Sequence, residues 1–337
     1  MLLALGGCQQ AANGPETIAT YLSRLSDALN TPVPPARMPS PRRLNQSPPS
    51  AYPIADDQLN LIDFLSLGGC ALQVNIGRRN SHLGRHASAS QRLILDIEFL
   101  QLAPDCIAHL QRNGEPELAQ TLALAMQHKR ETLVARIYNA VLAGEEWRRF
   151  WQIPTAVGAW PANTDAALID SLWQLSRWIE EILEGRWPAD PQQLEFYLGD
   201  LRRGDGGAAL LAIWMELDGL DQANRLLLAG AEAKPLCPFE HETPRAQHLQ
   251  AVVRRYFATD LQSWLVQVRK RSEALAEPIR QIEMQLSEAL PASYQRWARE
   301  RDELLGQVIG APRNHVHTVQ QVLSHCASTQ TDQTDSA

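Results

Sequence analysis

The sequence predicts an all-α protein: an irregular multi-helix bundle with a long C-terminal helix, tethered by a proline-rich linker. Apolar residues recur at spacings of three and four along most of the 337 residues, as expected for helices that bury one face. No segment shows the strict alternation of apolar and polar residues that is typical of a half-buried strand. A third observation predicts the linker, because prolines gather in residues 31–55 and separate the first helix from the rest.

Residues 1–8 are similar to the end of a bacterial lipoprotein signal. Leu5, Gly6 and Gly7 precede Cys8, and small residues in this position are typical of a lipobox, where the signal is cut and the cysteine receives its lipid. Cys8 is therefore the predicted lipid attachment site, and the membrane is the predicted partner through this anchor. The basic residues that open a secretory signal are missing, so we expect the natural start upstream. An ordinary cysteine near an ordinary start is the alternative.

Two segments follow the predicted signal remnant. Residues 9–30 are predicted to form an N-terminal helix, because Ile18, Leu22, Leu25 and Leu29 lie in one helical row. Residues 31–55 are the proline-rich linker, and prolines at this density favour an extended, semi-rigid backbone. We expect the linker to act as a strap between the anchored end of the chain and the folded body.

Residues 56–326 are predicted to form the all-helical domain, which begins with a helical hairpin. One arm precedes Gly77, and the second starts at Ser88, which forms a capping box with Gln91. Residues 77–86 are rich in glycine and short polar groups and are predicted to be the hairpin tip. The alternatives for this tip are an anion-binding site, or a loop tied to helix ends and to carboxylates such as Asp96 or Glu98. The candidate binding residues are Arg78, Arg79, Asn80, Ser81, Arg85 and Arg92.

Two short runs at this tip carry a resemblance. Residues 79–85, Arg-Asn-Ser-His-Leu-Gly-Arg, and residues 90–93, Ser-Gln-Arg-Leu, resemble the central signature of a family of Gram-negative lipoproteins whose domain is of unknown function. The resemblance extends more weakly over most of residues 15–290, and Ala89 stands where the family often has proline. It implies a location and no activity. Because Gln9 is not the aspartate used for inner-membrane retention, the implied location is the periplasmic face of the outer membrane.

The middle of the domain is predicted to be helical and is rich in tryptophan. Glycines and prolines mark helix boundaries near residues 114–116, 144, 185 and 204. Residues 147–214 hold seven of the nine tryptophans. These rings either line a groove for a glycan or lipid, or fill the contacts between helices.

Residues 261–289 have the most regular apolar pattern of the chain. Apolar or small residues step by four and three from Leu261 to Ala289, which predicts a heptad seam that packs against another helix. A protein partner along 261–289 is one candidate for that helix, and residues 292–309 of the same chain are the other. Pro278 is expected to kink the seam. Residues 327–337 lack apolar anchors and are predicted to be a disordered tail.

Four cysteines remain after Cys8 is assigned to the lipid, and an oxidising compartment allows them to pair. A disulfide between Cys70 and Cys106 is favoured, because the two residues lie on facing arms of the hairpin. In a straight hairpin turning near Gly77, however, their heights would differ by about 15 Å at 1.5 Å per residue. Cys237 and Cys326 either pair or stay free.

Composition and motifs exclude several classes of function. A formal net charge of −7 argues against a nucleic-acid partner, because binding to nucleic acid relies on neutralising phosphates. The chain lacks the spacings of zinc, di-iron and phosphate-loop sites, so we predict no metal and no cofactor. It also lacks the motifs of common hydrolases, so an enzyme is the third hypothesis, after an interaction module and a small-ligand protein. A gathering of His315, His317, His325 and Cys326 around zinc is the weaker alternative.

These observations predict a lipid-anchored cell-envelope protein that serves as an interaction or scaffold module facing the periplasm. The alternative is a protein that binds a small ligand (an anion, a glycan or a lipid) at the basic 78–92 tip or in the tryptophan-rich region 147–214. An interaction module should expose the apolar seam of residues 261–289. A small-ligand protein should instead show a concave pocket lined by several of the arginines or tryptophans.

Overall fold

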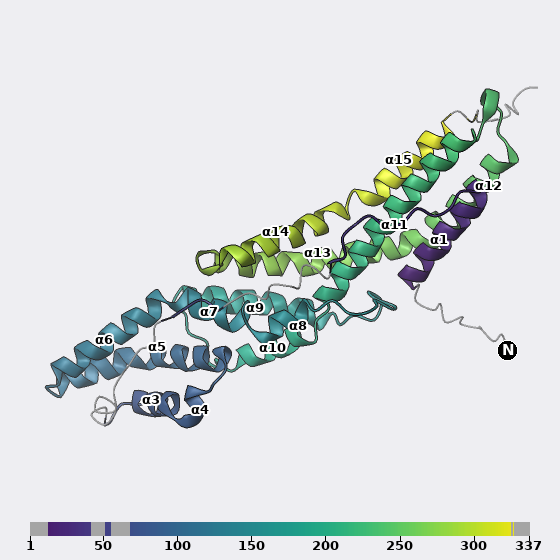
Figure 1. Ribbon diagram of the computed structural model, residues 1–337. Helices are drawn as coiled ribbons and strands as arrows, with labels where there is room; N and C mark the ends of the chain where they lie inside the picture. Colours follow the sequence, from purple (N-terminus) through teal and green to yellow (C-terminus); the bar gives the residue numbers. More distant parts are fainter. Residues whose placement is uncertain (1–12, 42–50, 55–67, 325, 327–337) are drawn as a thin grey trace, which may run out of the picture.

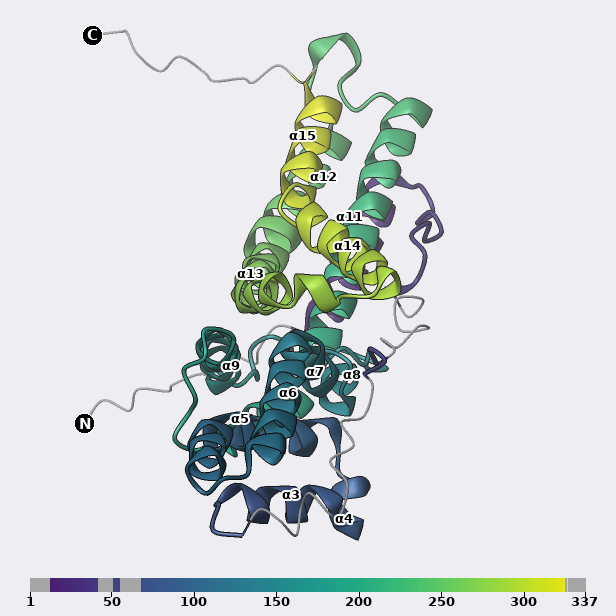
Figure 2. The same cartoon turned by 90° about the vertical axis from the view of Figure 1, so that its left-hand side faces the viewer.

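The computed structural model describes residues 13–41, 51–54, 68–324 and 326, and all regular secondary structure in these ranges is helical. The all-α prediction is therefore confirmed. The lipobox cysteine Cys8, residues 56–67 of the first hairpin arm and the tail 327–337 lie outside the described residues. Figures 1 and 2 show the helices in two groups, which meet where α9 packs against α13.

The first group contains the predicted hairpin and the tryptophan-rich region. It consists of α3 (Leu72–Asn80), α4 (His82–Arg85), α5 (Ala89–Arg112), α6 (Pro116–Glu131), α7 (Leu133–Val141), α8 (Glu145–Phe150), α9 (Ala167–Leu183) and α10 (Gln193–Arg202). The second group joins the N-terminal helix to the C-terminal part of the chain. It consists of α1 (Gly14–Leu29), α11 (Gly206–Ala233), η2 (Pro238–Glu240), α12 (Pro244–Val252), η3 (Val253–Leu261), α13 (Gln262–Gln285), η4 (Ser287–Ala289), α14 (Ala292–Gln307) and α15 (Ala311–Leu323).

The long C-terminal helix is composite. Helices α12, η3 and α13 follow one another without a break over residues 244–285, and the nine residues of η3 form a π-helix. Pro278 lies inside α13 and does not end it. The sequence pattern predicted helix over the seam of residues 261–289, but gave no sign of the π-helical segment before it.

The heptad seam is buried within the chain. Its nine positions from Leu261 to Ala289 are at most 4% exposed, and α13 packs against α9 and α11. Of the two alternatives for the covering helix, an element of the same chain is therefore the one observed. The second predicted element, residues 292–309, also meets this helix, because Tyr294 and Arg301 hydrogen-bond to Glu283. Leu305 lines a small cavity with the seam residues Leu275 and Ile279. The seam offers no exposed apolar face to a protein partner.

Helix α1 belongs to the same core, whereas its sequence pattern predicted a separate N-terminal helix ahead of the domain of residues 56–326. Its apolar row packs on α11, α12 and η3, and Leu25 and Leu29 are almost completely buried. Glycines in α11 allow this close approach, because a Cβ at Gly219 would lie 2.5 Å from Ile18 and one at Gly230 would lie 2.9 Å from Leu29. The helical row of α1 required a partner, and the partner is in the C-terminal half.

The proline-rich linker, where the structure describes it, lies on the body and does not extend away from it. The backbone N–H groups of Arg37 and Met38 donate to Asp218 Oδ1 at 3.2 and 3.3 Å. Asp218 is only 4% exposed, and its other oxygen accepts from Gln222 Nε2 at 2.7 Å, so the linker donors complete the pairing of a buried carboxylate. Arg225 also donates to the carbonyl of Pro35. The linker therefore connects two parts of one body, which corrects the expectation of a free strap.

Most of the tryptophan-rich region supports the second of its two interpretations. Trp147, Trp151, Trp160 and Trp178 are each at most 5% exposed and lie in the main hydrophobic core. Trp173 is 38% exposed on α9. The rings mainly fill contacts between helices, and the described residues show no tryptophan-lined groove in this region.

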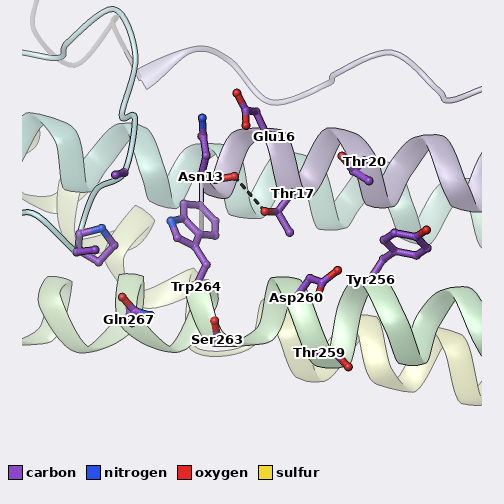
Figure 3. Close-up of a pocket in the computed structure, with 13 residues that line it drawn as sticks. Asn13, Glu16, Thr17, Thr20, Tyr256, Thr259, Asp260, Ser263, Trp264 and Gln267 are labelled. Carbon is purple, nitrogen blue, oxygen red and sulfur yellow. Dashed lines mark hydrogen bonds between the residues drawn. The ribbon is translucent and has the colours of Figure 1, made fainter. Parts of the chain in front are cut away.

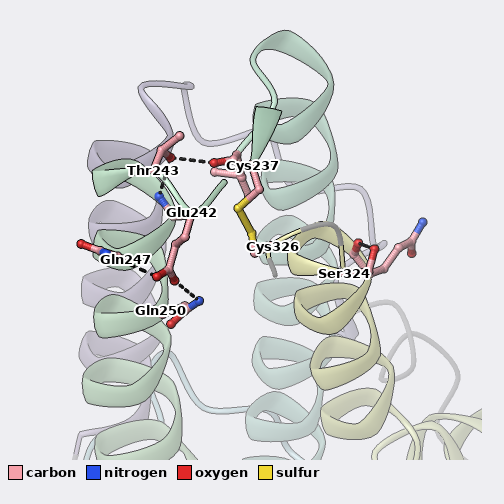
Figure 4. Close-up of a disulfide and its surroundings, with 10 residues drawn as sticks. Cys237, Glu242, Thr243, Gln247, Gln250, Ser324 and Cys326 are labelled. Carbon is pink, nitrogen blue, oxygen red and sulfur yellow. Dashed lines mark hydrogen bonds between the residues drawn. A yellow bond between two sulfur atoms is a disulfide. The ribbon is translucent and has the colours of Figure 1, made fainter. Parts of the chain in front are cut away.

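Two disulfides close the two ends of the molecule. Cys70 and Cys106 are joined beside α3 and α5, with their Cα atoms 5.4 Å apart. Cys237 and Cys326 are joined where the turn after α11 meets the chain beyond α15 (Figure 4), with their Cα atoms 5.0 Å apart. The pairing of Cys237 with Cys326, which the sequence left open, is therefore present.

Candidate binding cleft

The predicted hairpin tip is a corner of three helices. Helix α3 continues through Gly77 to Asn80, and the short α4 follows before α5 begins. The Ser81 hydroxyl caps α4 by accepting from the Gly84 N–H at 3.0 Å, and the Ser88 hydroxyl caps α5 by accepting from the Gln91 N–H at 3.2 Å. The cap at Ser88 is the one that the sequence predicts.

The position of the turn resolves the height difference between Cys70 and Cys106. The chain reverses at residues 86–88, not near Gly77, so Cys70 lies 16 residues before His86 and Cys106 lies 18 residues after Ser88. Helix α4 supplies the extra length of the first arm. The two cysteines therefore come level along the hairpin, with their Cα atoms 5.4 Å apart.

Most of the candidate tip residues bind their own chain. Arg78 forms a 2.8 Å salt bridge with Glu98, which also accepts from Asn75. Arg85 Nε donates to the Asn80 carbonyl at 3.1 Å. Arg92 Nη2 donates to the carbonyl of Arg85 at 2.8 Å. These contacts match the alternative in which the polar residues tie the tip to helix ends and to a carboxylate.

Arg79 is the tip residue that faces the interior of the first group. It lines a small pocket and a larger cleft, and Asp96 lines both as well. Asp96 is 3% exposed and accepts from Lys129 Nζ and Arg136 Nη1, each at 2.7 Å. A carboxylate that is buried with two cations fixes α5 against α6 and α7, because loss of either partner would leave a buried charge.

The larger hollow, which we call the central cleft, has a volume of about 530 Å³. It is bounded by the start of α5, by α7, by the chain entering α8 and by the linker residues 51–54. Arg79 and Arg92 from the candidate tip both line it, so the structure brings these two together. Arg78, Asn80, Ser81 and Arg85 are not among the lining residues.

Asn139 holds the linker in the central cleft. Its side-chain Oδ1 accepts from the Tyr52 N–H at 2.6 Å, and its Nδ2 donates to the Tyr52 carbonyl at 2.9 Å. One side-chain amide thus satisfies both backbone groups of one residue in a segment without regular secondary structure. Local sequence patterns do not predict this contact, because the two residues are 87 positions apart. The available signal was Asn139 itself, a polar residue within the largely apolar helix of residues 133–141.

The described residues also settle the position of the C-terminal histidines. His315 is buried and binds Tyr21 and Asn224, so its ring serves the core. No group of three or more histidine, cysteine, aspartate or glutamate side chains is placed to hold a metal within the part of the chain that the structure describes. His325 lies outside that part. None of the described helices combines the length and apolar composition that crossing a bilayer requires.

Comparison with known proteins identifies the family. The family model described as "Protein of unknown function (DUF3080)" matches residues 18–329, which is 312 of the 337 residues. A search of curated proteins and a search of solved structures returned no match. The expected membership in a family whose domain is of unknown function is therefore confirmed, and the chain belongs to the DUF3080 family.

Proposed function

We propose that the protein is a lipid-anchored cell-envelope protein on the periplasmic face of the outer membrane. We further propose that it acts as an interaction module, with the central cleft as its binding site for an extended polypeptide segment. The family match carries no activity, so the proposal rests on the geometry of the cleft and on the residues near the start of the chain. The pairing between Asn139 and the backbone of Tyr52 is the observation that carries it.

Asn139 binds the backbone N–H and C=O of one residue, two groups that an extended polypeptide presents on the same side. In an extended segment, the N–H and C=O of one residue point to the same side, and those of the next residue point to the other. An asparagine amide offers one acceptor and two donors, so it can bind both groups regardless of the side chain. Grooves that bind peptides commonly gain affinity from such main-chain contacts, and specificity from the pockets beside them.

The remaining walls of the central cleft supply those pockets. Ala140 of α7 and Ala143 just after it provide a small apolar floor, while Arg92 and Ser88 lie at the start of α5. The linker residue Tyr52 is 44% exposed where it crosses the cleft. We therefore propose that residues 51–54 show how a partner segment would lie, and that such a segment competes with them for Asn139.

The anchor at Cys8 remains a proposal, and the packing of α1 changes what it implies. Five residue steps separate Cys8 from Asn13, and an extended chain spans at most about 3.6 Å per residue. The anchor would therefore hold the body within about 18 Å of the membrane, by the same chain geometry. Two disulfides are consistent with an oxidising compartment such as the periplasm.

Site-specific photocrosslinking in the native envelope tests the central cleft. A photoreactive amino acid replaces Ala89, which lines the cleft and is exposed, and a matched control replaces the exposed Glu303 of α14. We expect the cleft position to crosslink to a polypeptide and Asn139→Ala to reduce that product at least fivefold, with no product from position 303. Lipid adducts alone, or a product that Asn139→Ala leaves unchanged at an unaltered melting temperature, would remove the cleft from the proposal.

A separate measurement tests the anchor. Mass spectrometry of the native protein should find Cys8 as the N-terminal residue, carrying acyl chains, and Cys8→Ser should move the protein from the membrane to the soluble fraction. An unmodified Cys8 in the native protein would overturn the anchor and leave the cleft experiment unaffected.

A further inference from the structure

Two histidines lie side by side on the outside of the corner formed by α3, α4 and α5. His82 is the first residue of α4, and His86 follows the last, so the two are four positions apart. The centroids of their imidazole rings are 4.8 Å apart, and both side chains are exposed. Neither ring forms a hydrogen bond within the part of the chain that the structure describes. Both are therefore available to a ligand from outside the chain.

The backbone that carries the two rings is held in place. Gly84, midway between them, is buried, and a Cβ there would lie 2.1 Å from the Arg78 carbonyl. Positions two apart on a helix face different sides, so the rings stand on the side of α4 turned away from α3. Arg85 Nε donates to the Asn80 carbonyl, and the Arg85 carbonyl accepts from Arg92 Nη2. A ligand of the two rings therefore requires little ordering of the backbone.

Two imidazoles with this spacing can chelate one transition-metal ion. Residues i and i+4 are neighbours on the surface of a helix, and two helical histidines with this spacing are a recurring pair of metal ligands. Imidazole nitrogen binds such an ion at about 2.0–2.1 Å, so two rings on neighbouring positions of one ion have centroids about 5 Å apart. The observed separation of 4.8 Å matches this value. Rotation of the side chains is enough to direct one nitrogen of each ring at a shared ion.

The charges around the pair restrict which metal ion can bind. Arg78 at the end of α3 is paired with Glu98 of α5. The same corner also contains Arg79, Arg85 and Arg92. This excess of positive charge opposes every cation, so an ion must gain enough from the imidazole nitrogens to overcome it. Affinity for nitrogen ligands among the divalent first-row metals is highest for Cu²⁺, whereas Mg²⁺ and Ca²⁺ prefer oxygen.

We propose that His82 and His86 together bind one Cu²⁺ ion. The two imidazole nitrogens take neighbouring positions of a tetragonal ion, and water fills the others. No third histidine, cysteine, aspartate or glutamate completes a metal-binding group with them among the described residues. The site is therefore open to solvent, and the ion remains exchangeable. This site does not depend on the central cleft or on the anchor at Cys8.

A second hollow of the molecule offers no comparable site for this ion. It has a volume of about 620 Å³ and lies between α1 and the composite C-terminal helix (Figure 3). Figure 3 shows Glu16 and Asp260 on its opposite walls, and Asp260 Oδ2 lies 3.8 Å from Arg255 Nε. No histidine or cysteine lines this hollow in the described ranges. Its carboxylates are oxygen ligands, which suit Mg²⁺ better than Cu²⁺.

Isothermal titration calorimetry of the purified full chain with Cu²⁺ tests the proposal. Excess glycine in the buffer competes for copper and suppresses weak sites. We expect one ion per chain, with a dissociation constant of about 10 μM or tighter after correction for glycine. His82→Gln and His86→Gln should each weaken binding at least tenfold, and the double variant should lose little more, because either change already breaks the chelate. His248→Gln, an exposed histidine on α12, is the matched control.

Two further measurements locate the bound ion. Electron paramagnetic resonance of the copper complex should show coupling to two imidazole nitrogens in the parent, and to fewer in either single variant. Amide hydrogen exchange in α4 should slow when Cu²⁺ is added to the parent, because a ligand that binds only the folded corner stabilises it. The same addition should leave α4 unchanged in both single variants, and Mg²⁺ should leave it unchanged in the parent.

Three outcomes would overturn the proposal. One is that no Cu²⁺ binds in the presence of glycine. Another is that both single variants keep the affinity and the exchange rates of the parent, which would place the ion elsewhere. The third is that each single variant loses one of two equivalent ions, which would make the rings separate sites. Melting temperatures of the variants, expected within a few degrees of the parent because both side chains are exposed, show that a loss of binding is not a loss of folding.

Discussion

Single residues show two ways in which charge is buried in this core. Arg301 is 1% exposed and binds both carboxylate oxygens of Glu283, at 2.7 and 2.8 Å. Tyr294 donates to the same carboxylate at 2.6 Å, so the group is fully paired. Glu216 is also 1% exposed, but neither of its carboxylate oxygens has a hydrogen-bond partner in the described protein. The first arrangement tolerates ionisation, and the second resists it.

Glu216 should make folding sensitive to alkaline pH. Burial raises its pKa from the ordinary value of 4.5 to about 8. The folded state therefore holds the proton more tightly than the unfolded state, and the stability contributed by the neutral acid is complete below about pH 4.5 and declines as pH rises towards 8. Glu216→Gln keeps the shape of the side chain and cannot ionise. At pH 8 the free energy of unfolding of this variant should therefore exceed that of the parent by a few kcal/mol.

Urea unfolding from pH 4.5 to 8.5 measures this difference, with the exposed Glu303→Gln as the control. The free energies of unfolding of parent and Glu216→Gln should diverge with rising pH, while the control should follow the parent. Parallel curves would show that Glu216 finds a partner in solution or ionises at its ordinary pKa.

His315 should make the folded state less stable as the pH falls, which is the opposite of the dependence expected from Glu216. Its Nδ1–H donates to Asn224 Oδ1 at 2.6 Å, and its Nε2 accepts from the Tyr21 hydroxyl at 2.7 Å, which requires a neutral ring. Burial lowers its pKa from 6.5 to about 4. The stability from this arrangement is therefore present above pH 6.5 and is lost as pH falls towards 4. His315→Gln should flatten the acid side of the stability profile, as followed by thermal melts. An unchanged acid slope would contradict the assignment.

Individual elements show what the sequence can and cannot predict. The cap at Ser88 and the seam of residues 261–289 follow from local patterns, so they could be predicted and were observed. The end of α3 could not, because Gly77 weakens a helix by only about 1 kcal/mol and packing on α5 outweighs that preference. The central cleft depends on Asn139 and Tyr52, which are 87 residues apart, and local spacing carries no information on such a contact.

Two glycines provide a test at the scale of the element. A Cβ at Gly84 would lie 2.1 Å from the Arg78 carbonyl and 2.5 Å from that of Arg79, so α4 could no longer pack on the end of α3. A Cβ at Gly306, inside α14, would meet nothing within 4 Å. Gly84→Ala should therefore destabilise the corner by about 2 kcal/mol or more, as overpacking does. Gly306→Ala should stabilise α14 by up to about 1 kcal/mol.

Amide hydrogen exchange separates these two effects. Gly84→Ala should speed exchange in α3 and α4 and leave the second group unchanged, because the contact is local. Gly306→Ala should slow exchange in α14. If Gly84→Ala leaves α3 as protected as in the parent, the tight corner does not exist in solution.

The molecule as a whole is closed at both ends by disulfides, and their contributions should differ. Cys70–Cys106 spans 36 residues and closes the corner of α3 to α5, whereas Cys237–Cys326 spans 89 residues and encloses α12 to α15. At the turn after α11, Thr243 Oγ1 donates to the Leu236 carbonyl at 2.6 Å, which supports the second disulfide (Figure 4). Longer loops lose more chain entropy when they are closed in the unfolded state.

Removing the longer disulfide should therefore have the larger effect. In the chain-entropy model, Cys237→Ser with Cys326→Ser should lower the free energy of unfolding by about 4–5 kcal/mol, and Cys70→Ser with Cys106→Ser by about 3–4 kcal/mol. Both values are upper estimates, since unfolded chains retain structure. Urea unfolding of the two double variants measures which disulfide contributes more to the free energy of unfolding. A reductant, which opens both disulfides, should lower the free energy of unfolding of the parent below that of either variant. Helix α15 ends three residues before Cys326, so the first variant should also expose α11 to exchange where α15 covers it. Two results would mean that the disulfides do not stabilise this fold in the expected way. One is a larger loss of stability when Cys70–Cys106 is removed than when Cys237–Cys326 is removed, and the other is a free energy of unfolding of the parent that the reductant leaves unchanged.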